Sequence, residues 1–218
     1  MIRHQDKILP TQPRMCERYK GENYAQAVAD LCQRFAPFYA APHEPQDYEL
    51  LSSPATVLSF LCMLIRIGGY RSVLEIGTLN GVSAIAFAKA GAVVITLEKG
   101  EEFYQLAKKN IEGIDDIQIL LGDALYILPK FLGRYDFIFI DGGKEDYHII
   151  AKLCERRLSK NGLMVIDDVF FDGDALNEIP ATDKGAGCKA VLEHYAARSD
   201  FDKWLLPIGN GLLILRKH

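Results

Sequence analysis

The chain has 218 residues, of which 49% are hydrophobic and 25% charged, with a formal net charge of −4. This composition predicts one globular α/β domain, excludes global disorder and disfavours a broad nucleic-acid-binding surface. No signal-peptide pattern opens the chain, and the longest apolar stretch, at 57–67, is too short to span a bilayer. Five scattered cysteines without a C-x-x-C motif predict reduced thiols and a cytoplasmic location: Cys16, Cys32, Cys62, Cys154 and Cys188.

Residues 1–50 are predicted to form an N-terminal extension of a single domain whose core spans 51–218. Helical spacing of apolar residues predicts one helix at 21–38 within the extension. A second helix is expected after Ser53-Pro54, where the serine caps the helix and the proline occupies its first turn. It should end at the glycine stop Gly68-Gly69.

Apolar runs and helical patterns then alternate, which predicts a parallel sheet with helices on both faces. Strands are expected at 73–77, 93–97, 117–121, 136–140 and 163–167, and helices at 82–90, 101–112, 124–132 and 145–158. The segments 204–208 and 212–215 flank a Gly-Asn-Gly turn and predict an antiparallel hairpin. The predicted fold class is therefore α/β, a Rossmann-like sheet of seven strands that is mostly parallel.

Residues 73–83 read V-L-E-I-G-T-L-N-G-V-S and predict a strand, a glycine-containing turn and a helix start. In a doubly wound sheet, this is where a ligand meets a helix N-terminus. Gly77 and Gly81 lack the middle glycine of the G-x-G-x-x-G dinucleotide fingerprint, and Glu75 would repel a pyrophosphate. The same carboxylate suits a cationic amino group. The stretch therefore predicts a site for S-adenosylmethionine (SAM) that includes Glu75, Gly77, Thr78 and Gly81.

Every predicted parallel strand ends at or near a carboxylate: Glu75, Glu98, Asp123, Asp141, or the pair Asp167 and Asp168. Ligands of such sheets bind outside the carboxyl ends of the strands. Glu98 is expected to accept hydrogen bonds from ribose hydroxyls, and Asp123 with Ala124 to meet the adenine. Ser83 is expected to bind the SAM carboxylate; its alternative is a helix-capping serine without a ligand.

Asp141, Asp167 and Asp168 meet at one place if the fourth and fifth strands are neighbours. Three like charges together are costly unless a cation joins them. Oxygen ligands favour Mg²⁺, or alternatively Ca²⁺ or Mn²⁺, and such an ion can lower the pKa of a bound hydroxyl. The alternative is an Asp-Asp loop that caps the next segment.

Lys144 follows Asp141 by three residues. Beside a bound cation its pKa could fall, so that it acts as a general base. Kept protonated by the aspartates, it would instead stabilise a phenolate. A surface lysine at a helix start is the third possibility.

Taken together, these motifs resemble the cation-dependent O-methyltransferases of the catechol and caffeoyl-coenzyme A type, including their short bacterial members. The resemblance runs from about residue 53 to the C-terminus. Its marks are V-L-E-I-G-T-x-x-G-x-S at 73–83, G-D-A at 122–124, Y-D-F-I-F-I-D-G-G-K-E-D-Y at 135–147, G-L-M-V-I-D-D-V-F-F-D-G at 162–173 and L-P-I-G-N-G-L at 206–212.

The resemblance implies the class I SAM-dependent methyltransferase fold and a homodimer. It places SAM at or beside Glu75, Gly77, Ser83, Glu98, Asp123 and Asp141. It implies that the metal is held by Asp141, Asp167 and Asp168, and that Lys144 and Asp141 are the catalytic residues.

Four positions depart from the family pattern. Asp168 stands where Asn is usual, Gly142 where Ala or His is usual, and Val57-Leu58-Ser59 where Glu-Gly-Gln is usual. Asn210 replaces an Asp before the final glycine. In the family these regions and the N-terminal extension shape the acceptor pocket and lid. The departures therefore leave the chemical identity of the acceptor undetermined. We expect the loop at 170–187, which begins with two phenylalanines, to be the lid.

The predicted function is SAM- and divalent-metal-dependent methyl transfer to a hydroxyl of a small catechol-like acceptor with vicinal hydroxyls. The alternative is O-methylation of wobble 5-hydroxyuridine in tRNA, which Lys7, Arg14, Arg18 and Lys20 favour and the acidic balance opposes. The missing fingerprint glycine disfavours a nicotinamide-dependent oxidoreductase. Lys144 together with the aspartates disfavours a non-catalytic SAM- or metal-binding protein.

Overall fold

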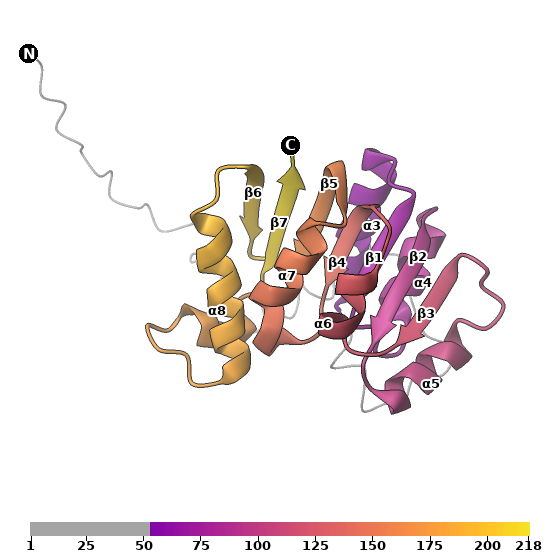
Figure 1. Cartoon of the computed structure of the whole chain (residues 1–218), viewed down its shortest axis with the longest axis horizontal. Helices are drawn as coiled ribbons and strands as arrows, with labels where there is room; N and C mark the ends of the chain where they lie inside the picture. Colours follow the sequence, from indigo (N-terminus) through magenta and orange to yellow (C-terminus); the bar gives the residue numbers. More distant parts are fainter. Residues whose placement is uncertain (1–52) are drawn as a thin grey trace, which may run out of the picture. The chain divides into compact units, whose positions relative to one another are not determined.

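The computed structural model describes residues 53–218, so the predicted helix at 21–38 and the boundary after residue 50 lie outside the described residues. One sheet organises this part of the chain (Figure 1). Its strands are β1 (Ser72–Ile76), β2 (Val93–Glu98), β3 (Ile117–Leu121), β4 (Tyr135–Ile140), β5 (Leu158–Ile166), β6 (Phe201–Leu206) and β7 (Leu212–Lys217). The spatial order is β3-β2-β1-β4-β5-β7-β6. Strands β1 to β5 are parallel, and β7 is antiparallel to both β5 and β6, which confirms the predicted fold class and hairpin.

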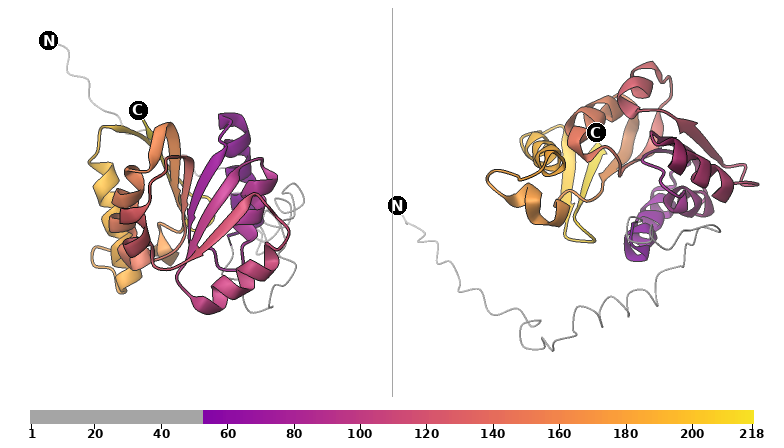
Figure 2. Two further views of the ribbon diagram at one scale, coloured as in Figure 1. Left: turned by 45° about the vertical axis from the view of Figure 1, so that its right-hand side comes forward. Right: turned by 90° about the horizontal axis from the view of Figure 1, so that it is seen from below.

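Helices cover both faces of the sheet, as Figure 2 shows. They are α3 (Ala55–Gly68), α4 (Val82–Lys89), α5 (Glu101–Asn110), α6 (Ala124–Ile127), α7 (Tyr147–Glu155) and α8 (Asp183–Ala196). Helices α3 and α4 bury their apolar sides against one face, while α6, α7 and α8 pack on the other. None of these helices, within residues 53–218, is long and apolar enough to cross a bilayer.

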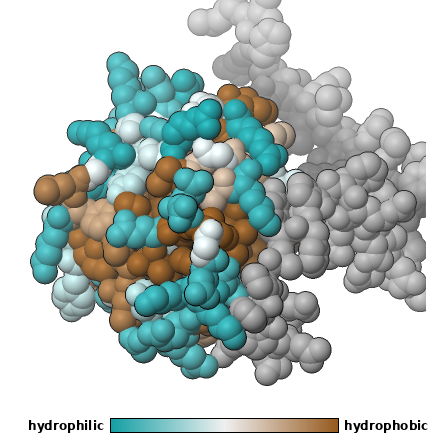
Figure 3. Space-filling model, turned by 90° about the vertical axis from the view of Figure 1, so that its right-hand side faces the viewer, coloured by the Kyte–Doolittle hydropathy of each residue, from teal (hydrophilic) through white to brown (hydrophobic). Residues whose placement is uncertain are grey.

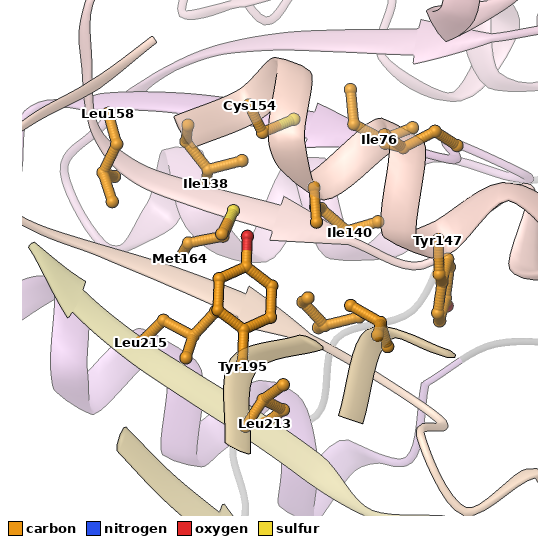
Figure 4. Packing of buried hydrophobic residues seen from close by; sticks show 14 of the residues in the cluster. Ile76, Ile138, Ile140, Tyr147, Cys154, Leu158, Met164, Tyr195, Leu213 and Leu215 are labelled. Atoms are coloured by element: carbon orange, nitrogen blue, oxygen red, sulfur yellow. The ribbon is translucent and has the colours of Figure 1, made fainter. Parts of the chain in front are cut away.

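The centre of the sheet is apolar on both faces because it is covered on both sides. The larger buried cluster lies under α7 and α8, where Tyr195 points among Met164, Leu213 and Leu215 (Figure 4). Such burial is the main favourable contribution to folding. It fixes the carboxyl ends of β1, β4 and β5 side by side, which is the property the site depends on.

Two predicted helices are shorter than expected. The segment 124–132 is helical only over α6 and a 3₁₀ turn at Leu128–Lys130, because Pro129 lacks the N–H that would continue an α-helix. The segment 145–158 begins as a 3₁₀ turn at Lys144–Asp146 and ends with α7 at Glu155. Strand β5 then begins at Leu158, five residues before the predicted start at 163.

The predicted lid at 170–187 is not one loop. It contains a 3₁₀ segment, Phe171–Leu176, and the first turn of α8, which the sequence analysis missed. The sequence does not predict this helix, because Gly185 and Gly187 lie within it and glycine is unfavourable in helix interiors. The fold requires glycine at 187, since a Cβ atom there would lie 2.1 Å from the backbone oxygen of Lys144.

Strand β3 is an edge of the sheet, and apolar side chains gather on that side of the molecule inside a hydrophilic ring (Figure 3). Leu121, at the end of β3, is 43% exposed.

Candidate functional site

A cavity of about 740 Å³ opens at the carboxyl ends of the strands, where β1 has β2 on one side and β4, which the chain reaches from β3, on the other. This switch point is where doubly wound sheets bind ligands. Ten of the predicted site residues line it: Gly77, Thr78, Ser83, Glu98, Asp123, Ala124, Asp141, Lys144, Asp167 and Asp168. Two do not, since Glu75 lies within β1 and Gly81 forms the N-cap of α4.

The turn after β1 packs backbone against backbone on the turn after β4. Gly77 has a φ of +96°, and a Cβ atom there would lie 2.8 Å from the backbone oxygen of Asp141. A Cβ atom on Gly142 would in turn lie 2.9 Å from the Cα atom of Gly77. The departure at Gly142 thus has a physical reason, because a larger residue would separate the two turns.

Glu98 fixes the other side of the same turn. Its Oε2 accepts hydrogen bonds from the backbone N–H groups of Thr78, at 3.1 Å, and Leu79, at 2.9 Å. Its Oε1 accepts one from Gly100, at 2.8 Å. The carboxylate therefore holds the turn in place besides lining the cavity.

Glu75 is fully buried, and neither of its carboxylate oxygens has a hydrogen-bond partner among the described residues. Burial raises the pKa of Glu75 to about 8, although the nearby hydroxyls of Ser83 and Thr96 oppose the shift. A buried carboxyl without a partner is costly, and such groups concentrate at functional sites. Glu75 lies directly beneath the turn that lines the cavity.

Asp123 and Ser83 each lie at the start of a helix and line the cavity. The Asp123 side chain accepts a hydrogen bond from Leu125 N at 2.8 Å and caps α6, while it also lines the cavity. Ser83 lies in the first turn of α4 and faces the same cavity, but it does not cap the helix, whose N-cap is Gly81 without a side-chain bond.

Three carboxylates and one lysine meet at the ends of β4 and β5. Lys144 Nζ lies 2.9 Å from Asp141 Oδ1 and 3.0 Å from Asp168 Oδ2. The Lys144 side chain is only 15% exposed. Asp168 has a left-handed φ of +56°, a conformation that Asp and Asn tolerate better than most residues.

Ser53 completes this cluster, and the sequence analysis missed it. Its hydroxyl lies 3.2 Å from Asp141 Oδ2 and 3.1 Å from Asp167 Oδ2, and its one proton can go to only one of them at a time. The serine therefore does not cap α3, whose N-cap is Pro54 with no side-chain bond. No local pattern could reveal this role, because its partners are 88 and 114 residues away.

The charged side chains in the cluster shift one another's pKa values. Burial, together with the charges of Asp141 and Asp168, raises the pKa of Asp167 to about 7. Burial also raises the pKa of Asp141, against the effect of Lys144. For Lys144, burial alone would lower the pKa, but Tyr147, Asp141 and Asp168 outweigh it and raise it. The lysine is thus a cation within this cluster, which favours charge stabilisation over the general-base role.

Side chains behind the cluster hold its backbone. Tyr147 is fully buried and donates a hydrogen bond from its hydroxyl to the Asp167 carbonyl at 3.0 Å. The thiol of Cys188 on α8 lies 3.7 Å from the Asp168 carbonyl oxygen. Helix α8 therefore supports the end of β5 and, through Gly187, the turn that carries Lys144.

The donor chemistry of the three aspartates fits a hard divalent cation, since all their ligand atoms are oxygens. Their present positions are set by Ser53 and Lys144 rather than by a shared centre. Within residues 53–218, no group of three or more His, Cys, Asp and Glu side chains is arranged to hold a metal ion. The metal site therefore remains a prediction.

The family model described as O-methyltransferase matches residues 43–218. The chain belongs to this O-methyltransferase family. The resemblance to enzymes of the catechol and caffeoyl-CoA type is confirmed, because relatives with both names match the chain. The alternative of a nicotinamide-dependent oxidoreductase is therefore wrong.

Among curated relatives of this O-methyltransferase chain, a catechol O-methyltransferase from Niastella koreensis is 36% identical, over 68% of this chain and 72% of its own. An O-methyltransferase from Aspergillus hancockii is 37% identical over 45% of this chain, but the match spans only 42% of that protein. The solved structure of an O-methyltransferase from Bacillus cereus in complex with SAH is 25% identical, with a TM-score of 0.71, and covers 91% of this chain and 92% of that one.

Proposed function

We propose that this protein is a SAM-dependent and divalent-metal-dependent O-methyltransferase that acts on small aromatic acceptors with vicinal hydroxyls. The observation that carries the proposal is the meeting of Asp141, Asp167, Asp168 and Lys144 at one end of the cavity at the sheet's switch point. The relatives named catechol O-methyltransferase support the acceptor class.

SAM is assigned to the part of the cavity bounded by the turn after β1 and by Glu98. The buried carboxyl of Glu75, which has no hydrogen-bond partner among the described residues, would supply a negative group to a cationic cofactor once its proton is released. The close packing of Gly77 on Gly142 holds the turn that borders this part of the cavity. The Bacillus cereus relative with SAH supports the same assignment.

A divalent ion, with Mg²⁺ as the first candidate and Ca²⁺ or Mn²⁺ as alternatives, would be held by Asp141, Asp167 and Asp168. When bound, it supplies the positive charge that lowers the pKa of the acceptor hydroxyl. Lys144, held as a cation by Asp141 and Asp168, stabilises the negative oxygen that attacks the methyl group. The acceptor hydroxyl releases its proton to solvent, and the oxygen–carbon bond then forms as the carbon–sulfur bond breaks, so that the sulfur leaves as a neutral thioether. The cavity contributes mainly by positioning the two reactants.

A methyl-transfer assay over a panel of acceptors tests this proposal. The panel contains catechols, monohydroxylated aromatics and bulk tRNA that lacks wobble methylation, and products are identified by mass. We expect methylation of the catechols and little of the monohydroxylated compounds. Methylation of tRNA alone would favour the alternative acceptor, and no methylation of any hydroxyl would contradict the proposal. The expected homodimer can be checked on the same preparation by light scattering.

A further inference from the structure

The segment that follows Asp168 is strained. Phe171 and Asp172 have φ values of +44° and +51°, and Gly173 follows at +90°. Left-handed backbone costs free energy for residues other than glycine, and it persists only where the surroundings enforce it. Some feature of the fold must therefore hold residues 171–173 in this conformation.

Asn210, in the turn between β6 and β7, makes the contacts that hold it. Its Oδ1 accepts a hydrogen bond from Asp172 N at 3.0 Å, and its Nδ2 donates one to Asp172 Oδ1 at 3.1 Å. Its backbone oxygen accepts a third from Phe170 N at 2.9 Å. An amide side chain supplies the acceptor and the donor on two separate atoms, as this pair uses them.

The pair lies at the edge of the reactive cluster. Phe171, Asp172 and Asn210 all line the cavity, as do the aspartates and Lys144. Phe171 N donates a hydrogen bond to the Asp168 carbonyl at 3.0 Å, so the strained segment begins one turn after the expected metal ligand. A shift of residues 171–173 would therefore change the cavity wall beside Asp168.

We propose that Asn210 is a positioning residue for the methyl acceptor. Through its reciprocal pair with Asp172 it holds Phe171 as the wall of the cavity next to Asp168. The inference rests on the proposed function, because the acceptor is assigned to that end of the cavity. It concerns acceptor binding and leaves the SAM end unaffected.

Two variants separate pairing from side-chain size. Asn210→Asp keeps the shape but places two carboxylates opposite each other, and it replaces the donor by an acceptor. The double variant Asp172→Asn with Asn210→Asp restores one donor and one acceptor. In it, the new amide at position 172 donates to the new carboxylate at position 210, which still accepts from the backbone N–H of residue 172. Asn177→Asp is the matched control, because Asn177 donates to Asp174 in the same region at 3.3 Å but does not line the cavity.

Two readouts are measured for each protein. Amide hydrogen exchange of a peptide covering residues 169–173 reports on the segment itself. The KM for catechol at saturating Mg²⁺, compared with the calorimetric affinity for S-adenosylhomocysteine, reports on the acceptor end. We expect Asn210→Asp to raise both the exchange rate and the KM about tenfold, the factor of one hydrogen bond of ordinary net strength. S-adenosylhomocysteine affinity should stay within about twofold, the scatter expected of remote sites.

The double variant should recover the wild-type exchange rate and the wild-type KM for catechol, and Asn177→Asp should match the wild type in both. Unchanged exchange and KM in Asn210→Asp would overturn the proposal, as would a double variant as impaired as the single one. A wild-type protein that methylates no catechol contradicts the proposed function instead. In that case the exchange rates still decide whether Asn210 holds the segment, and unchanged rates overturn the inference.

Discussion

The two ends of the cavity are built in different ways. At the end assigned to SAM, the turn after β1 is fixed by glycine contacts and by two of its backbone N–H groups, which donate to Glu98. At the end assigned to the acceptor, Asp141, Asp167 and Asp168 crowd around one lysine and one serine. Strained backbone follows them. The first end is held by backbone contacts, whereas the second gathers three carboxylates around one lysine and depends on contacts between distant segments.

This contrast has a consequence for variants. Changes at the SAM end should alter cofactor affinity, since its groups meet the cofactor before any reaction. Changes at the acceptor end should alter turnover or acceptor binding and leave cofactor affinity intact.

Asp167→Asn should have the largest effect. It keeps the shape of a buried side chain and replaces the negative charge of one of three candidate metal ligands by a neutral amide. We expect kcat/KM for catechol to fall about 1,000-fold or more, as befits the loss of transition-state charge stabilisation. Steady-state kinetics at several Mg²⁺ concentrations measure this, with S-adenosylhomocysteine affinity as the folding control. A loss of less than threefold would place the metal elsewhere.

Glu75→Gln should weaken S-adenosylhomocysteine about 10- to 100-fold, the range for a hydrogen bond to a charged group. The reason is that the buried carboxyl, which has no hydrogen-bond partner within residues 53–218, can meet the ammonium group. Calorimetric titration measures the affinity, and Glu101→Gln on exposed helix α5 is the control. Equal affinities for Glu75→Gln and wild type would remove Glu75 from the cofactor site.

The same variant makes a prediction about pH. The folded-state pKa of Glu75 is raised to about 8, above its unfolded value, so its protonated form is stabilised by folding. The unfolded chain releases this proton first as pH rises, and the ligand-free protein should lose stability between about pH 5 and pH 8, by at most about 1.4 kcal/mol per pH unit. Urea unfolding at both pH values should show a smaller loss for Glu75→Gln. Parallel pH profiles would show that Glu75 does not titrate in this range.

Gly187→Ala tests the support behind Lys144. The added Cβ would lie 2.1 Å from the Lys144 carbonyl oxygen and must displace the turn or the helix. We expect kcat to fall about tenfold and stability to fall by about 1–3 kcal/mol, as for an overpacked site. Ala186→Ser, on the exposed side of the same helix, should be close to wild type. A stability loss without any change in kcat would mean that α8 does not position Lys144.

Phe171→Ala should have the smallest effect. Phe171 lines the cavity beside Asp172, and its removal opens the wall next to the acceptor. We expect the KM for catechol to rise about fivefold, an ordinary loss of apolar contact, with S-adenosylhomocysteine affinity unchanged. An unaltered catechol KM would count against the role of this segment as the acceptor wall.

The sequence predicts the SAM end better than the acceptor end, for physical reasons. Buried parallel strands are continuous apolar runs, so the ends of β1, β2 and β4 and the acids after them can be placed from sequence. The glycine stop after α3 is equally local, and Gly69 takes the left-handed conformation it requires.

The contacts at the acceptor end cannot be predicted from local sequence patterns, because they join distant parts of the chain. The local sequence at Ser53 predicts a helix cap, yet its hydroxyl is within hydrogen-bonding distance of aspartates on the turns after β4 and β5. Helix α8 is not predicted because it contains two glycines, which the tertiary contacts require. Asn210 stands out only as a departure from a family pattern, and its partner Asp172 lies 38 residues away.

Methyl transfer to catechol, measured with and without metal, shows whether the reaction needs a divalent cation. The wild-type protein is treated with chelator, desalted and assayed with SAM while Mg²⁺ is added back in steps. The account predicts that transfer disappears after chelation and returns with Mg²⁺, and that Asp167→Asn fails to recover over the same range. Undiminished transfer in the metal-free protein would contradict it.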